Sequence, residues 1–353
     1  MKNTKPHGNK EILTGINIRK VKSAYKQTLR TKWFSKNVLP ITRKKQTWDE
    51  KIIKIILHIL LRIAAPRISW KNKPKINELV NRSYNNYMRK DIVFIPISLS
   101  FYFLISFVPI ITIILILLSA LKYNVMFLDV ILTKIIPGIN SVIKFPESSD
   151  SGTQYVYLGV LAISSLWLSA SGFNRFVYSQ NYIYQHDYLG NWFINQLKGL
   201  VIVFCISLYL TGVIIIYLLF FESVTQSLTS SYDTNIFFYF TFSIYLFLAL
   251  CLGIFLLFKL TPSFINPMHT VIPGVIVSAV PITIFITSFG YLTSIIDYNK
   301  YGIIGTFLYI SLLVSTMSFF LIIGSIVNEA YYKTYYSSYT IAKKSWLFWK
   351  VKF

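Results

Sequence analysis

One short segment carries the side chains best suited to hold a ligand. Ser169, Ser171, Asn174 and Arg175 follow closely on one another at the end of an apolar run. Ser171 and Arg175 are four residues apart, so both would lie on the same face of a helix. A guanidinium can hold a phosphate through two parallel hydrogen bonds, so the segment predicts an anion contact such as a lipid phosphate. The alternative is that Arg175 only anchors its helix by snorkelling to the membrane surface.

A second group of candidate positions combines helix breakers with a polar side chain, at Pro273, Gly274 and Asn328. Broken helices and polar side chains inside apolar segments are typical of transport sites. Close helix packing is the other interpretation, because small residues at spacings such as Ser165 to Ser169 let helices approach each other. We treat all these positions as one candidate polar or ligand face.

The residue patterns of common enzymes are missing from the chain. The four histidines share no metal-ligand spacing, and neither GxxxxGK[ST] nor GxSxG occurs. The long apolar runs contain no Asp or Glu, so paired carboxylates are also missing. We therefore expect no enzyme, with no catalytic residues, no metal site and no cofactor.

Six uncharged runs are long enough to carry these residues across a membrane, which takes about 20 apolar residues as a helix. They are 92–121, 151–174, 199–221, 234–258, 260–296 and 301–328. The fifth run has a polar start, so its helix is expected to begin near His269. Since none alternates like a barrel strand, the runs predict an all-α polytopic membrane protein with a six-helix transmembrane bundle.

The charge of the chain divides it into regions. The net charge is +22, and residues 1–90 hold 23 of the 35 Lys and Arg. We predict a basic cytoplasmic amino-terminal extension over 1–77, a six-span membrane domain over 78–332 and a basic cytoplasmic tail over 333–353. The expected location is the cell membrane.

Residues 51–65 of the extension predict an amphipathic helix. Lys51, Lys54, His58 and Arg62 fall on one helical stripe, and the residues between them are apolar. Such a helix would lie on the anionic inner leaflet, with Lys51, Lys54 and Arg62 at the membrane surface, or pack on the cytoplasmic face of the protein. Membrane lipids are the expected partners. No nucleic acid is expected, and self-association is left open.

Three stretches of the chain resemble the YihY/virulence factor BrkB family of bacterial inner-membrane proteins, over about residues 78–332. Residues 99–109 are similar to the family's A-F-Y-x-L-x-S-L-x-P, and residues 166–171 with 181–184 to its L-W-x-S-A-S and N-R-I-Y. Pro273-Gly274 and residues 301–305 are similar to its P-G and Y-G-x-x-G. The resemblance implies a polytopic membrane protein, linked in some members to virulence or serum resistance.

One position departs from the family pattern G-A-E-x-N in the last span. Ile326 stands where the family has a glutamate, which puts proton coupling in doubt unless Glu329, further along the helix, takes its place. Two functions remain open: a transporter or lipid-handling protein, and a non-transporting membrane scaffold or virulence-associated protein. The family's old label, ribonuclease BN, is the weakest candidate because metal ligands and carboxylate pairs are missing.

The distribution of charge predicts that both termini are cytoplasmic. With this orientation, 31 Lys and Arg lie inside and 4 lie in outer loops, as the positive-inside rule requires. Topology reporters fused at Phe353 and within residues 222–233 should report opposite sides of the membrane. An outward carboxyl terminus would contradict the six-span prediction.

Overall fold

The computed structural model describes residues 48–64, 72–120, 152–186, 192–227, 234–295, 302–343, 345–346 and 349–350. Its helices are α2 (Trp48–Ala64), α3 (Lys73–Tyr87), α4 (Lys90–Ala120), α7 (Gly152–Ile183), α8 (Trp192–Ser227), α9 (Thr234–Leu260), α10 (Met268–Ile295) and α11 (Gly302–Tyr335). Two-residue strands β1 (Ser345–Trp346) and β2 (Trp349–Lys350) pair antiparallel. The predicted extension before Trp48 lies outside the described residues.

Five helices in the described part of the chain are long and apolar enough to cross a membrane. These spans are Ile92–Ile114, Trp192–Phe220, Phe240–Leu260, Met268–Leu292 and Ile303–Tyr335. The predicted span 151–174 overlaps α7 over residues 152–174; α7 has 32 residues and is not among the five. The all-α membrane fold is thus confirmed, while the count of six spans stays a prediction. The start of α10 at Met268 confirms the one expected near His269.

The pair α10 and α11 packs more extensively than any other two described helices. A Cβ atom on Gly274 would lie 2.2 Å from the carbonyl oxygen of Gly324, and one on Gly324 would lie 2.0 Å from Ser278 Oγ. Only glycine therefore fits at these two crossing points. Pro273 lies inside α10 without ending it, because a membrane helix with packed neighbours tolerates proline.

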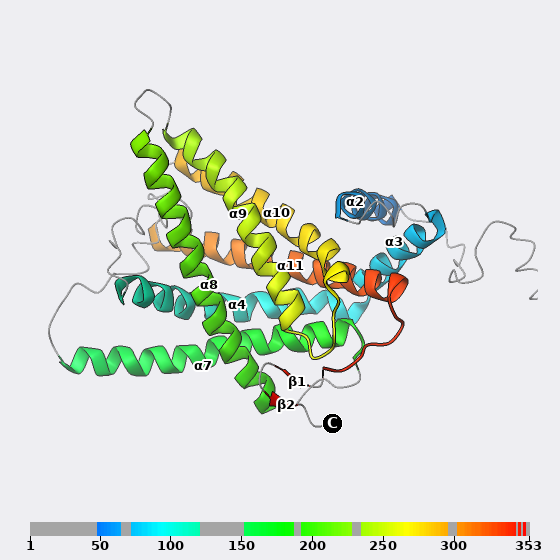
Figure 1. The fold of residues 1–353 in the computed structure, drawn as a ribbon, viewed down its shortest axis with the longest axis horizontal. Helices are drawn as coiled ribbons and strands as arrows, with labels where there is room; N and C mark the ends of the chain where they lie inside the picture. Colours follow the sequence, from blue (N-terminus) through cyan, green and yellow to red (C-terminus); the bar gives the residue numbers. More distant parts are fainter. Residues whose placement is uncertain are drawn as a thin grey trace, which may run out of the picture.

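The main apolar core fills the space between α4, α7, α9, α10 and α11. Phe176, Phe264 and Tyr309 are among its largest fully buried side chains. Figure 1 shows α8 crossing α7 and α4 at a steep angle. The helices α7 and α8 nearly touch at Gly199, where a Cβ atom would lie 2.1 Å from the carbonyl oxygen of Ala170.

A second, smaller core attaches α2 and α3 to the bundle. Leu61 of α2 and Leu79 of α3 are buried together with Val277 of α10 and Val327 of α11. Pro74 occupies the first turn of α3. Proline is tolerated there because the first backbone N–H groups of a helix have no partner within the helix. Helix α3 runs without interruption through residues 77 and 78, where the sequence suggested a boundary between extension and membrane domain.

We expect the variant Gly274→Ala to destabilise the protein by about 1–3 kcal/mol, as overpacking of a filled core does. The new methyl group would collide with α11 backbone that cannot move aside. Gly212→Ala is the matched control, because its methyl group would meet nothing within 4 Å and alanine favours helix by about 1 kcal/mol. Thermal unfolding in detergent should show a lower midpoint only for Gly274→Ala; equal midpoints would contradict the close approach.

Candidate functional site

A groove of ligand size lies between α4 and α7. Its volume is about 270 Å³, and each helix contributes four lining residues: Phe94, Ile95, Ser98, Leu99, Arg175, Tyr178, Ser179 and Tyr182. Beside the groove, α4 exposes further large apolar side chains at Ile97 and Phe101. On a membrane-spanning helix such side chains are expected to face the acyl chains, which would place the groove beside lipid.

Arg175 lies in the wall of this groove with its side chain exposed. Its guanidinium carbon is 5.3 Å from the ring centroid of Tyr102 on α4, a distance at which the ring attracts the cation. About two helical turns further along α7, the guanidinium of Arg89 lies 5.8 Å from the ring centroid of Tyr182. The groove therefore combines apolar walls with the guanidinium of Arg175, while Arg89 lies against one of its lining residues, Tyr182.

The neighbouring predicted site residue Ser169 is buried in a helix contact. Ser106 Oγ on α4 donates a hydrogen bond of 3.2 Å to the carbonyl oxygen of Ser169. A Cβ atom on Gly172 would lie 2.8 Å from the same Ser106 Oγ. Near Ser169 the small residues of α7 therefore let α4 and α7 pack closely. This agrees with the interpretation that small residues here serve helix packing.

Ser171 and Asn174 meet a residue of α8 instead of the groove. Gln196 donates to Ser171 Oγ at 3.0 Å and to the carbonyl oxygen of Trp167 at 2.9 Å, and Asn174 donates to Gln196 Oε1 at 3.3 Å. Of the four candidate residues on α7, only Arg175 lines the groove. Sequence spacing gave the relative angles of these residues on the helix but could not identify the neighbouring helix that each one faces.

Pro273, Gly274 and Asn328 are brought together between α10 and α11. The backbone N–H of Gly274 donates to Asn328 Oδ1 at 2.6 Å, and Asn328 is buried. Asn328 Nδ2 is buried without a hydrogen-bond partner. These residues lie on other helices than the groove, so the structure divides the candidate polar face into two separate places.

A buried polar cluster joins the end of α7 to the loop between α9 and α10. Asn181 Nδ2 donates to Ser263 Oγ, and the backbone N–H of Ser263 donates to Asn181 Oδ1, both at 3.1 Å. Thr261 donates to Gln180 Oε1 at 2.7 Å. The ring of Tyr184 packs at a tilt against Phe264 with centroids 4.5 Å apart, and burial raises the pKa of the Tyr184 hydroxyl. These contacts fix the end of the helix that carries Arg175.

The segment after α11 returns to the same loop and caps α9. Lys343 Nζ donates to the carbonyl oxygens of Lys259, Leu260 and Pro262 at 3.3, 3.3 and 2.9 Å. The last carbonyl groups of a helix lack intrahelical partners. A cation beside them also interacts favourably with the negative end of the helix dipole. Burial, together with the nearby Lys259 and Lys198, lowers the pKa of Lys343 to about 8.

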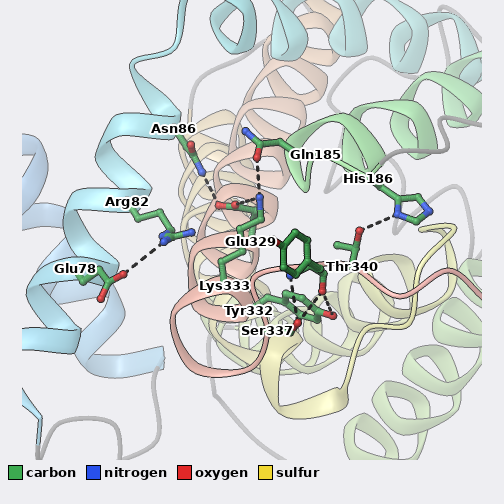
Figure 2. Close-up of polar contacts among 11 residues, drawn as sticks. Glu78, Arg82, Asn86, Gln185, His186, Glu329, Tyr332, Lys333, Ser337 and Thr340 are labelled. Carbon is green, nitrogen blue, oxygen red and sulfur yellow. Dashed lines mark hydrogen bonds and ion pairs between the residues drawn. The ribbon is translucent and has the colours of Figure 1, made fainter. Parts of the chain in front are cut away.

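A buried carboxylate links α11 to α3 and to the end of α7 (Figure 2). Glu329 pairs with Lys333 at 3.1 Å and accepts a hydrogen bond from Asn86 Nδ2 at 2.5 Å. Lys333 donates in turn to Gln185 Oε1 at 2.9 Å. Gln185 has a backbone φ of 54°, a left-handed conformation that costs a residue other than glycine about 1–2 kcal/mol. These four residues form the Glu329 network, in which Lys333 holds the Gln185 side chain.

The basic residues predicted for the membrane surface lie on α2 with different surroundings. Lys51 and Arg62 are exposed. Lys54 pairs with Glu50 at 2.6 Å and lies 5.0 Å from the ring centroid of Tyr84 on α3. Within the described residues, no three His, Cys, Asp or Glu side chains gather where they could hold a metal ion.

Comparison with protein families gives one match, which covers most of the bundle. Residues 83–346 match the family described as Virulence factor BrkB, well over half of the 353 residues. The chain belongs to this family. Comparisons with curated proteins and with solved structures gave no match. The resemblance expected from three sequence stretches is therefore confirmed.

The stretches that resemble the BrkB family lie at helix contacts. The segment 99–109 lies on α4 and includes the groove residue Leu99 as well as Ser106, which binds the Ser169 carbonyl. The segment 181–184 ends α7 and carries the contact of Asn181 with Ser263. These family-like residues thus set the helix positions on which the groove depends.

The position expected to depart from the family pattern lies in the apolar core of this BrkB family member. Ile326 is buried in the main core. Glu329 instead faces Asn86 of α3 and Lys333. Its surroundings therefore differ from those of Ile326, although three residues separate the two on one helix.

Several residues of the polar cluster escaped the sequence analysis. Gln180, Ser263 and Lys343 stand outside any recognisable motif, and their contacts join segments about 80 residues apart. The one available signal was the polar stretch from Thr261 to Thr270 between two apolar runs. A polar stretch at a helix end marks a loop but does not identify what it binds.

We expect Glu329→Ala to destabilise the protein by about 3–5 kcal/mol, because it breaks an ion pair whose carboxylate is buried and leaves the partly buried Lys333 without its charged partner. Glu78→Ala is the matched control, since it removes another i,i+4 pair that is more exposed and 3.5 Å long and worth about 0–1 kcal/mol. Chemical unfolding in detergent should separate the two variants. Equal losses would show that the Glu329 network adds no more than a surface pair.

Proposed function

We propose that this protein handles phospholipids, holding an anionic phospholipid in the groove between α4 and α7. The observation that carries the proposal is the exposed guanidinium of Arg175 in a groove of about 270 Å³ beside exposed apolar side chains of α4. A charged side chain beside acyl chains is costly. A lipid phosphate in the groove would offset that cost by supplying the opposite charge.

The chemistry of the groove walls suits both ends of such a molecule. Phe94, Ile95 and Leu99 offer an apolar surface to an acyl chain, while Ser98 and Ser179 bring hydroxyl groups near Arg175. Arginine can contact two oxygens of one phosphate. These features support a phospholipid over a fully water-soluble solute.

The packing of the bundle supports activity at the lipid-facing edge. At the crossing of α10 and α11, the close approach of Gly274 to Gly324 leaves no room for a side chain, let alone a solute. The same tight contact favours the second candidate, a membrane scaffold that binds lipid without moving it. The two functions differ in one observable, the movement of phospholipid between leaflets.

The proposal includes a location and an orientation. We infer a cell-membrane protein with both termini in the cytoplasm and with the groove in the inner leaflet. Arg82, Arg89 and Lys333 all lie at the end of the bundle where α4 begins and α11 ends, which supports this orientation through the positive-inside rule. The chemistry proposed is binding and movement of lipid, not catalysis.

Purified protein in nanodiscs that contain anionic phospholipid tests the groove. Native mass spectrometry should show that Arg175→Ala weakens retention of the anionic phospholipid about tenfold or more, as expected for a lost hydrogen bond to a charged group. Arg175→Lys should recover only part of the affinity, because an ammonium cannot make the planar two-point contact. Full recovery with lysine would leave Arg175 as an anchor and contradict the proposal.

A second pair of variants tests the groove without changing charge. Ser98→Trp should fill the groove and reduce retention, whereas Ile97→Trp places the same ring one residue away on the exposed face and should not. Proteoliposomes with a labelled anionic phospholipid then separate the two functions. Faster exchange between leaflets that is lost in Arg175→Ala supports lipid handling, and retention without exchange supports the scaffold.

A further inference from the structure

We propose that α2 is an in-plane membrane helix, with its exposed isoleucine face inserted among the acyl chains and its basic stripe among anionic headgroups. The evidence lies on α2 and its neighbours and is independent of the groove. The sequence left open whether this helix would face lipid or protein. The structure provides a separate face for each.

The circumference of α2 divides into three sectors at about 100° per residue. Leu57, Leu61 and Ala64 form a buried sector that packs in the second core. An apolar sector carries the exposed side chains Ile52, Ile55, Ile56 and Ile59, and a basic stripe carries Lys51, Lys54, His58 and Arg62. A helix between protein, hydrocarbon and headgroups needs one sector for each of these three surroundings.

The packing partners of α2 indicate its depth. Val277 lies nine residues after Met268, where the α10 span begins, and Val327 lies eight residues before Tyr335, where the α11 span ends. At a rise of 1.5 Å per residue, both lie about 12–14 Å inside the ends of their spans. Val327 also lies at the end of the uncharged run 301–328, two residues before Glu329, so the buried sector of α2 packs near the boundary between acyl chains and headgroups.

The spacing of the exposed isoleucines identifies a continuous apolar surface. Ile52, Ile55, Ile56 and Ile59 follow the i, i+3, i+4, i+7 pattern of one helix face, and all four are exposed. Such a face is costly in water. Helix α2 packs on α10, which crosses the membrane and exposes apolar side chains of its own, such as Ile272. The isoleucine face of α2 therefore lies beside a helix that faces lipid.

The ends of α2 carry the residues that favour a membrane surface. Trp48 is exposed, with the ammonium of Lys51 5.6 Å from its ring centroid, and tryptophan is enriched at membrane interfaces. Arg62 is exposed near the other end. Lys54 contacts Tyr84 of α3, so Lys51 and Arg62 are the cations that remain available to headgroups.

Charge favours lipid over a second copy of the chain as the occupant of the isoleucine face. Residues 1–90 contain 23 Lys and Arg against 4 Asp and Glu. A symmetric dimer through α2 would bring two such segments together, and like charges repel. An anionic leaflet has the opposite charge and attracts the same residues.

Fluorescence quenching in the full-length protein tests the position of α2. In a Cys205→Ala, Cys251→Ala background, single cysteines at Ile55, Ile59 and Lys51 receive an environment-sensitive fluorophore in nanodiscs containing anionic phospholipid. Phospholipids with brominated acyl chains should quench the labels at 55 and 59 several-fold more than the label at 51. Aqueous iodide should show the reverse order.

Two results would overturn the proposal. Iodide quenching at 55 and 59 as strong as at 51 would place the isoleucine face in water. Weak quenching by both agents, together with disulfide cross-linking of Ile55→Cys between two copies, would identify a second copy as the occupant. Because the side chains at 51, 55 and 59 are exposed, their replacement by cysteine should leave the fold intact. Leu57→Cys in the buried sector should resist both quenchers and cross-linking.

Charge variants test the basic stripe in the same preparation. Lys51→Glu with Arg62→Glu should abolish most of the brominated-lipid quenching at position 55 when the nanodisc is rich in anionic lipid. Lys73→Glu, which reverses an exposed charge at the start of α3, is the control and should leave the quenching unchanged. If Lys73→Glu reduced the quenching as much as Lys51→Glu with Arg62→Glu does, a specific role for the basic stripe would be contradicted.

Discussion

The close approach of α10 and α11 is the contact on which the other helices depend. Gly274 and Gly324 meet backbone to backbone, and Asn328 binds the Gly274 N–H beside that crossing. Between helices in a membrane, lipid competes as an apolar partner, so association relies on close packing and hydrogen bonds. The pair then provides the surface on which α2 and α3 pack through Val277 and Val327.

Polar contacts at one end of the bundle hold the remaining elements in place. Asn181 joins α7 to the loop after α9, and Lys343 caps α9. Glu329 joins α11 to α3. Because a buried polar group without a partner costs about 1–3 kcal/mol, each contact opposes separation of the segments it joins. The helix that carries Arg175 is consequently fixed at its end.

The two surfaces proposed for lipid share a physical cause. In the groove a guanidinium lies beside apolar walls, and on α2 a basic stripe lies beside exposed isoleucines. Each combines a cation with hydrocarbon-compatible surface, which matches the boundary between headgroups and acyl chains. A membrane protein of the BrkB family could therefore hold lipid at its edge while the crossing of α10 and α11 stays closed.

The sequence by itself determined the apolar helices, the amphipathic helix near 51–65 and the family, and it predicted an anion contact at Arg175. These properties follow from local periodicity, composition and motif order. The tertiary structure decided which neighbour each residue meets: it placed Arg175 in a groove, Ser171 beside Gln196, and Asn328 against Gly274. Helical spacing fixes angles around one helix, whereas partners depend on which helices pack together, and that choice rests on contacts between residues far apart in the chain.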